Sequence, residues 1–442
     1  MTAETVTTGR RRPLVLRNRA FGAVWLGQVL TQAAVRMFQV GVSWWLVAYA
    51  VSGGRGLASG LFMAVSTLPA VALAPVVARA IARCAHRSVL RTAAAGAGTA
   101  AAALAVWAGT AGLPLAAAYA ATLALSTCQA FFDPCLTTSV PELVDDEDIE
   151  AATGFELSTQ SLASLGGALL GALIVDRAGI AGLAVGCAVA YATAALLVTS
   201  ARFRPLAADG EAGEADGGQR TLRSILSGLP FVRRILVCFT AANLFTTAVF
   251  VVIPLYTKSV LHNGGSTVAL LEASLGTGTL IGSFTGARVP GRPTVVGASC
   301  LGLMAAALAL PGLVASQLAF AGGLVVAGWC VGVIGVRFVA LFQRLVPAAD
   351  KPGFFAVMQA VLGATFPVAS LLFGLLGDAL SARTLCLVQA AGILPVACML
   401  ALLGDPAPAA SEESEEPAEA MASMASMEDT DPALAGTAGG ER

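Results

Sequence analysis

Long apolar stretches alternate with short polar segments along most of the chain. Twelve of these stretches reach the length of about 20 apolar residues that an α-helix needs to cross a bilayer. They lie near residues 21–50, 57–80, 88–109, 113–134, 151–175, 180–200, 233–257, 267–287, 294–313, 317–343, 354–378 and 383–403. The pattern predicts an all-α membrane protein with twelve transmembrane helices.

The polar segments predict how the chain is divided. The longest internal one covers residues 201–230, and its Gly and acidic residues are typical of a flexible linker. This linker leaves six spans on each side. The predicted parts are a basic N-terminal segment (1–18), a six-helix bundle (19–200), the linker (201–230), a second six-helix bundle (231–404) and an acidic tail (405–442).

The tail holds ten of the 27 acidic residues and is of low complexity. This composition favours a disordered, solvated segment. A docking segment is the alternative.

An internal repeat supports two related halves. Arg79 and Arg83, after the second span, recur as Arg288 and Arg292, after the eighth, with an offset of 209 positions in both cases. Two pseudo-symmetric six-helix bundles would explain this recurrence.

Composition and charge narrow the function. The chain is 57% hydrophobic and only 12% charged, whereas soluble proteins carry about 25% charged residues. This excludes soluble enzymes and nucleic-acid binders as the main interpretation. If the N-terminus is inside, 19 basic residues fall on inner segments and four on outer loops. The positive-inside rule then predicts a multi-pass protein of the cell membrane with both termini in the cytoplasm.

The sequence lacks the motifs of an enzyme. It contains no GxxxxGK[ST] phosphate loop, no nucleophile-elbow pattern and no metal motif, and His86 and His262 are its two histidines. The nine cysteines show no paired or metal-binding spacing. We therefore expect no enzymatic activity, no cofactor and no metal.

Several short segments resemble the drug-antiporter branch of the major facilitator superfamily, which includes macrolide-efflux proteins and the enterobactin exporter. They are Asn18-Arg19-Ala20-Phe21 with Trp25-Leu26-Gly27-Gln28, Phe131-Phe132-Asp133-Pro134 with Pro141-Glu142-Leu143-Val144, Ile253-Pro254-Leu255-Tyr256, Gly276-Thr277-Gly278 with Gly282, and Gln343-Arg344-Leu345-Val346-Pro347. The resemblance implies two six-helix bundles and proton-driven export of a small apolar or amphipathic compound.

Three positions depart from the pattern of this branch. The inner loop between spans 2 and 3 normally carries Gly-x-x-x-Asp-Arg, but residues 78–83 place Ala82 at the Asp position. Many relatives have Asp-Arg in span 1, where this chain has Val35-Arg36, and the span 5 Gly-Pro is Gly166-Gly167. The resemblance therefore supplies no proton carrier in span 1.

Polar residues within the spans are the candidate pathway, because a charge at the bilayer centre costs roughly 2.5–3.5 kcal/mol unless it faces a cavity or a partner. In span 1, Gln28, Gln32, Arg36 and Gln39 fall on one helical face. This stripe predicts a water-filled pathway; a structural network between helices is the alternative.

Span 5 adds Glu156, with Gln160 on the same face. We expect Glu156 to interact with Arg36 and to carry the transported proton; a fixed structural ion pair is the alternative.

The second half contributes three candidates. Glu272 is expected to bind protons or a cationic substrate, or else to line an outer vestibule. Arg337 either lines the pathway or reaches the inner surface. Asn243 is a further cavity candidate. At the outer end of span 1, Trp44 and Trp45 are expected in an interfacial belt or in contact with an apolar substrate.

Charged residues at the inner end predict a gate. Asp133 lies at the inner end of span 4, and the acids that follow it from Asp145 onward are expected to pair with Arg79, Arg83, Arg87 or Arg91 when the inner side closes. The alternative is that these acids favour a helix N-terminus.

The sequence thus predicts a secondary transporter that exports a drug, natural product or siderophore in exchange for protons. Its expected partners are the small-molecule substrate, protons and the lipid bilayer, without nucleic acid, and a monomer is expected. The alternatives are an importer, an uncoupled facilitator, or a transport-inactive sensor or scaffold.

Overall fold

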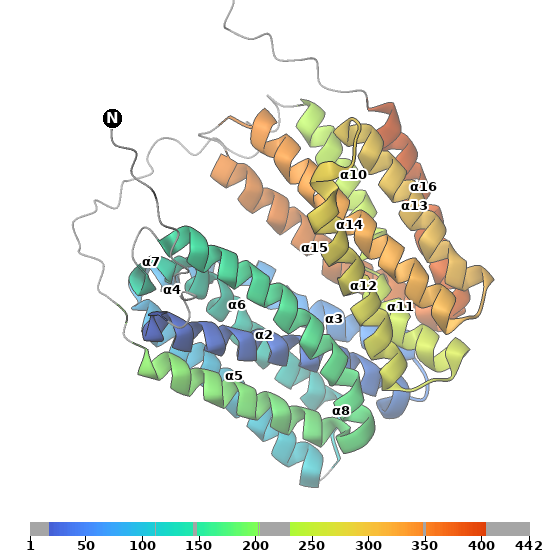
Figure 1. The fold of residues 1–442 in the computed structure, drawn as a ribbon. Coiled ribbons are helices and arrows are strands. Elements are labelled where there is room, and N and C mark those ends of the chain that lie inside the picture. The colour runs from blue at the N-terminus through green and yellow to red at the C-terminus, as the bar shows by residue number, and fades with distance from the viewer. Residues whose placement is uncertain are drawn as a thin grey trace, which may run out of the picture. The chain divides into compact units, whose positions relative to one another are not determined.

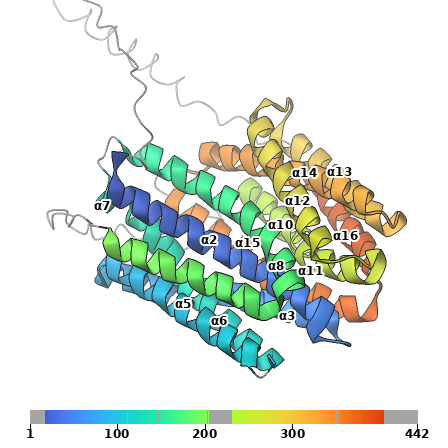
Figure 2. The ribbon, with the colours of Figure 1, turned by 60° about the horizontal axis from the view of Figure 1, so that its bottom comes forward.

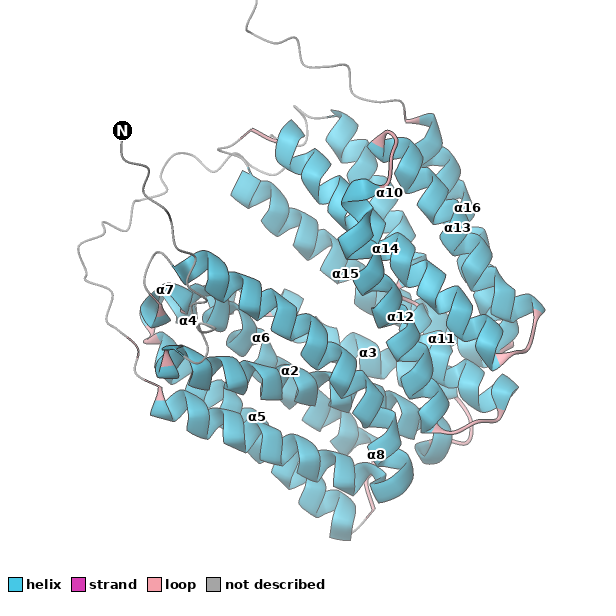
Figure 3. Cartoon of the chain, viewed as in Figure 1, coloured by secondary structure: helices cyan, strands magenta, loops and turns pink. Residues whose placement is uncertain are grey.

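The computed structural model describes residues 17–110, 112–144, 148–201, 203, 230–347 and 351–403. Helices cover nearly all of these residues, and none of them forms a strand (Figure 3). The all-α prediction is confirmed. Most of the predicted linker and N-terminal segment and the whole acidic tail lie outside the described residues.

The first half contains the six spans predicted before the linker (Figure 1). Its helices are α2 (Arg19–Trp45), continued by the π-helical turn η1 (Leu46–Ala50), then α3 (Arg55–Ala72), α4 (Ala74–Arg83), α5 (His86–Thr110), α6 (Leu115–Thr138), α7 (Val140–Leu143) and α8 (Ile149–Ser200). The second predicted span is divided into α3 and α4, and α8 contains both the fifth and the sixth.

The second half contains the other six spans. Its helices are α10 (Pro230–Thr246), α11 (Val249–Tyr256) with the π-helical turn η3 (Thr257–Leu261), α12 (Gly265–Thr285) with the 3₁₀ turn η4 (Gly286–Arg288), α13 (Pro293–Leu313), α14 (Gln317–Leu345), α15 (Lys351–Ala379) and α16 (Ala382–Leu402). All twelve predicted spans therefore correspond to helix.

Ten helical stretches of the described residues are long and apolar enough to cross a membrane. One of them, 165–200, combines the second part of the fifth span with the whole sixth span. The first span, α2, is not among the ten. Its polar stripe lowers its hydropathy, which is expected of a helix that lines a pathway.

Local sequence explains where the helices begin and break. The side chain of Asn18 caps α2 by accepting hydrogen bonds from the backbone N–H groups of Ala20 (3.0 Å) and Phe21 (3.1 Å). Gly179 breaks α8 with φ 66° and ψ −173°, a conformation that suits glycine. The break separates the fifth span from the sixth.

Within each half, the helices pack as a bundle. In the first half α8 packs against α2 and α5, and in the second half α14 packs against α12 and α13 (Figure 2). Between the halves, α3 contacts α15 and α8 contacts α12. The second and fifth spans of one half therefore contact the fifth and second spans of the other.

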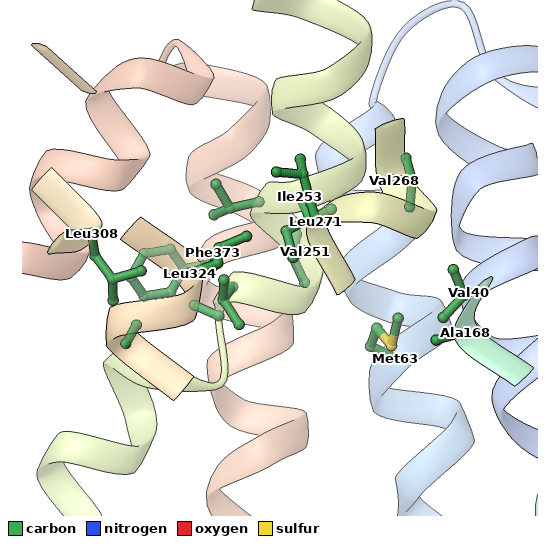
Figure 4. Close-up of a cluster of buried hydrophobic side chains, with 14 of the residues drawn as sticks. Val40, Met63, Ala168, Val251, Ile253, Val268, Leu271, Leu308, Leu324 and Phe373 are labelled. Carbon is green, nitrogen blue, oxygen red and sulfur yellow. The ribbon is translucent and has the colours of Figure 1, made fainter. Parts of the chain in front are cut away.

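The halves also share an apolar core. Figure 4 shows buried side chains from both, with Val40, Met63 and Ala168 from the first half and Val268 and Leu271 from the second. A separate cluster around Phe21, Leu90 and Phe132 contains first-half residues alone and lies toward the predicted inner end. At its predicted inner end, the first half therefore has a core of its own, and the core that it shares with the second half lies elsewhere.

Close packing of α12 against α14 depends on glycine. A Cβ added at Gly328 would lie 2.9 Å from the backbone nitrogen of Thr279, and one at Gly332 would lie 2.6 Å from that of Ser283. Small residues let helix backbones approach closely in membranes.

Gly328→Val is expected to destabilise the protein, because the added side chain meets backbone that cannot move away. Overpacking of this kind costs roughly 1–3 kcal/mol, so the melting temperature of the purified protein should fall by roughly 5 °C. The matched control is Gly322→Val on the same helix, since no atom lies within 4 Å of a Cβ there. If both variants lower the melting temperature equally, the close packing of α12 against α14 is not what the Gly328 substitution disturbs.

Candidate functional site: the central cavity

A cavity of about 540 Å³ lies between the two halves. We call it the central cavity. It is lined by Gln32, Val35, Arg36, Gln39, Leu165 and Ala168 from the first half and by Phe250, Glu272, Leu275, Gly276, Thr279 and Leu280 from the second. The first-half wall comes from α2 and α8, and the other wall comes from α11 and α12.

The polar stripe of α2 forms the hydrophilic wall of this cavity. Positions 32, 36 and 39 share a face because an α-helix turns by about 100° per residue. Arg36 Nη1 donates a hydrogen bond to Gln39 Oε1 (3.1 Å), and the guanidinium carbon lies 5.8 Å from the centroid of the Phe250 ring. The guanidinium is therefore held by its own helix and stacked on a residue of the other half.

Glu272 approaches the cavity from the second half. Its side chain is half-buried, and it has no hydrogen-bond or ion-pair partner among the described residues. The two walls thus carry opposite charges, Arg36 on one and Glu272 on the other. A charge inside a membrane protein is tolerated where it faces water or an opposite charge, and a cavity with both charges provides these conditions.

Two further pockets continue from the second-half wall. A pocket of about 180 Å³ shares Phe250, Leu275 and Thr279 with the central cavity. A third, of about 220 Å³, shares Met304 and Val331 with the second pocket. The lining of the third pocket is mostly apolar and includes Phe239, Phe338 and Phe342. The cavity system is therefore polar on the α2 side and apolar within the second half.

A fourth pocket, of about 240 Å³, lies within the first half and shares Val35 and Gln39 with the central cavity. Asp133 lines this pocket and accepts hydrogen bonds at Oδ1 from Gln32 Nε2 (2.7 Å) and from Gln129. The carboxylate of Asp133 is thus connected to the central cavity through Gln32.

The other predicted pathway residues lie in different surroundings. Gln28 is buried and does not line the central cavity. Asn243 lines the second and third pockets, and its Nδ2 donates to the carbonyl of Leu362 (3.0 Å). Arg337 donates to the carbonyl of Gly291, in the loop after α12, as expected if it reaches the inner surface. The side chains of Glu156 and Gln160 lie outside the described residues.

The predicted inner-gate residues have the following surroundings in the described part of the chain. Arg79 and Arg83 are exposed on α4, and Arg87 donates a hydrogen bond to the carbonyl of Thr199. Asp133 accepts hydrogen bonds from two amides, as described above, and Asp145 lies outside the described residues. The pairing of these arginines and acids in a state with the inner end closed stays a prediction.

Other charged side chains pair at this end of the first half. Asp148 forms an ion pair with Arg17, and His86 Nδ1 lies 2.6 Å from Glu142 Oε1. Neither contact reaches the second half.

Some residues with a place in the site were not found by sequence reasoning. Phe250 and Thr279 line the cavity, but an apolar or hydroxyl side chain inside a span gives no distinct signal. Trp44 is fully buried, and its Nε1 donates to Asp176 (2.6 Å), so the interfacial belt expected for Trp44 was wrong. The sequence did contain a signal for Asp176: an aspartate stands at the end of the fifth span in both halves, Asp176 in the first and Asp378 in the second.

No group of three or more His, Cys, Asp or Glu side chains in the described part of the chain could hold a metal ion. The polar groups that line the central cavity are one guanidinium, one carboxylate, two amides and one hydroxyl, beside the single aromatic ring of Phe250.

Comparisons with known proteins agree with this architecture. A family model described as Major Facilitator Superfamily matches residues 24–290. The search of curated protein sequences finds no match.

Solved structures of similar fold have several functions. A bacterial homologue of the human lysosomal transporter Spinster, inward-facing and occupied, has a TM-score of 0.70 at 12% identity over 88% of this chain and 98% of that one. A variant of the nucleoside transporter NupG has a TM-score of 0.68 at 12% identity over 87% and 100%. A D-xylose–proton symporter has a TM-score of 0.66 at 12% identity over 87% and 97%. At these identities the similarity concerns the fold.

Proposed function

Because the chain belongs to the Major Facilitator Superfamily, we propose that it is a secondary active transporter that exports a small amphipathic compound in exchange for protons. The supporting observation is the central cavity, which lies between the halves and has Arg36 on one wall and Glu272 on the other. Substrate and ion sites of such transporters lie where the repeats meet near the bilayer midplane. Alternating access then moves the two halves about this site.

The lining of the cavity supports an amphipathic substrate. A polar or charged group fits the wall formed by Gln32, Arg36 and Gln39, where a guanidinium and two amides are available. The apolar body fits the pockets that continue past Phe250 into the second half. Drugs, natural products and siderophores with this division of polarity are the classes we propose.

Glu272 is proposed as a proton carrier of the exchange. It faces the cavity and can be neutralised by one proton, whereas Arg36 stays charged. If substrate binding near Arg36 requires Glu272 to be ionised, then proton and substrate exclude each other, as antiport requires. Glu156 remains a second candidate from the sequence.

We further propose a monomer of the cell membrane with both termini in the cytoplasm. Its parts would be an N-terminal segment (1–18), two bundles (19–200 and 231–404), a linker (201–230) and a tail (405–442). The excess of basic residues on one side of the spans supports this orientation.

One observation favours a second function. Span 1 has Val35-Arg36 where relatives of the resembled branch carry Asp-Arg. An importer or an uncoupled facilitator does not need that acid. A transport-inactive sensor or scaffold would depend on its acidic tail, whereas an exporter lacking residues 405–442 should still transport.

Accumulation in cells tests these proposals together. The protein is expressed in a bacterial host lacking its own efflux pumps, and intracellular levels of fluorescent cations, macrolides and siderophores are followed. We expect the protein to lower the accumulation of at least one compound, a protonophore to restore it, and removal of residues 405–442 to have little effect. Accumulation raised by the protein would indicate import, and export insensitive to the protonophore would contradict proton coupling.

A further inference from the structure

Two aspartates link the halves at the predicted outer end. Asp378, at the end of α15, accepts hydrogen bonds at Oδ1 from the backbone N–H of Gly56 (2.8 Å) and at Oδ2 from that of Leu57 (3.0 Å). Asp176, in α8, accepts a hydrogen bond at Oδ2 from the backbone N–H of Gly265, the first residue of α12. Each carboxylate therefore caps a helix that belongs to the other half.

The chemistry of both contacts is favourable. The first N–H groups of a helix have no partner within the helix, and the helix dipole favours a negative charge there. Asp176 is also held from its own half, because Oδ1 accepts hydrogen bonds from Trp44 Nε1 (2.6 Å) and Tyr49 Oη (2.8 Å). Its carboxylate is thus fixed by its own half as well as by the N-terminus of α12.

The internal repeat relates the two contacts. α3 and α12 are the second spans of their halves, while Asp176 and Asp378 end the fifth spans. Gly56 and Gly265 are separated by 209 positions, the same offset as between Arg79 and Arg288. The fifth span of each half therefore holds the second span of the other, and the arrangement is reciprocal.

The backbones touch beside both carboxylates. A Cβ added at Gly56 would lie 2.9 Å from the carbonyl carbon of Gly377, and one at Gly265 would lie 2.8 Å from that of Ala172. The close approach of α3 to α15 and of α12 to α8 brings each carboxylate within hydrogen-bond distance of the opposite helix. The halves are in direct contact at both places.

We propose that Asp176 and Asp378 are paired outer latches, which hold the outer end closed and must both release before it opens. This rests on the alternating access proposed above. When the halves separate at this end, the carboxylates and the helix termini exchange their mutual hydrogen bonds for bonds to water. Each latch therefore stabilises the closed state and not the open state. Both latches act on the same equilibrium between these two states.

Labelling of the cavity from outside the cell tests the latches. Thr279→Cys places a thiol in the cavity lining, and a membrane-impermeant maleimide reaches it from outside when the outer end opens. Asp378→Ala and Asp176→Ala should each raise the labelling rate roughly fivefold, as expected for the loss of one helix cap. The double variant should show roughly the product, about 25-fold, because both losses shift one equilibrium.

Two sets of controls accompany the measurement. Asp→Asn at each position keeps an acceptor oxygen and should raise the rate less than Asp→Ala. Arg383→Gln should leave the rate unchanged, because Arg383 lies at the same end but donates to the carbonyls of Gly312 and Leu313 in its own half. The chain without Thr279→Cys gives the background of the native cysteines.

A double Ala variant that is monodisperse, melts like its parent and is labelled at the parent rate would overturn the proposal. If that variant does not fold, spin labels at Gly53→Cys and Leu380→Cys, beside the Asp378 latch, provide a second measurement on the full chain. Asp378→Asn should add a longer-distance population, and an unchanged distribution would overturn the proposal too. Neither readout uses a substrate. If the variants are labelled faster but the protein transports none of the compounds, the latches are supported and only the proposed export function is contradicted.

Discussion

Glu272→Gln is expected to abolish uphill export, lowering it at least tenfold, while exchange of substrate across the membrane continues. The physical reason is that Gln keeps the shape and the hydrogen-bonding capacity of Glu but cannot take up or release a proton. Glu272 has no hydrogen-bond partner among the described residues, so the substitution breaks no described contact. The variant should therefore bind and carry substrate without coupling to the proton gradient.

The measurement compares two assays in proteoliposomes containing the full chain. Uphill transport is driven by an imposed pH gradient, and exchange is followed between equal substrate concentrations at equal pH. Glu272→Asp keeps a carboxyl group and should retain part of the uphill transport. If Glu272→Gln retains full, gradient-dependent transport, the proton carrier lies elsewhere, and Glu156 is the next residue to replace. Loss of exchange together with uphill transport would instead make Glu272 a substrate ligand.

Arg36→Gln is expected to lower transport at least tenfold in both assays, because it removes the positive charge of the cavity wall. It also removes the stacking on Phe250 and weakens the link to Gln39. Arg36→Lys keeps the charge but loses the planar guanidinium, so it should recover only part of the activity. The effect should appear mainly in substrate affinity, since Arg36 is proposed to bind the polar group of the substrate.

A double variant tests whether Arg36 and Glu272 balance each other. Each single neutralisation leaves one uncompensated charge in the cavity, which should lower the melting temperature. Arg36→Gln with Glu272→Gln removes both charges and should recover part of that loss. If the losses of the single variants simply add, the two charges do not interact across the cavity. Phe250→Leu serves as a control that changes the wall without changing its charge.

The helices could be predicted from the sequence because each span satisfies its own backbone hydrogen bonds and exposes apolar side chains to lipid. This is a local property, and a window of about 20 residues contains it. The polar stripe of α2 was also readable, since Gln32, Arg36 and Gln39 share a helical face and do line the central cavity. Periodicity identifies such a face without identifying what it meets.

The limits of periodicity appear at particular residues. Gln28 belongs to the same stripe but is buried away from the cavity. Asp133 was assigned to a gate because it lies at the inner end of the fourth span, and its hydrogen bonds to Gln32 and Gln129 gave no signal in the sequence. Partners on other helices depend on rotation and crossing angles, which a single sequence does not specify. The outer aspartates were missed for the same reason, although each lies at the end of the fifth span of its half.

The break at Gly179 affects how the outer end can move. The fifth and sixth spans are joined there by one residue without helical geometry, so the chain has little slack between them. Asp176 lies three positions before this break, on the fifth span. It cannot swing away from α12 as part of a flexible loop while the helices stay in place. Opening at this latch is therefore expected to move the fifth span as a whole helix.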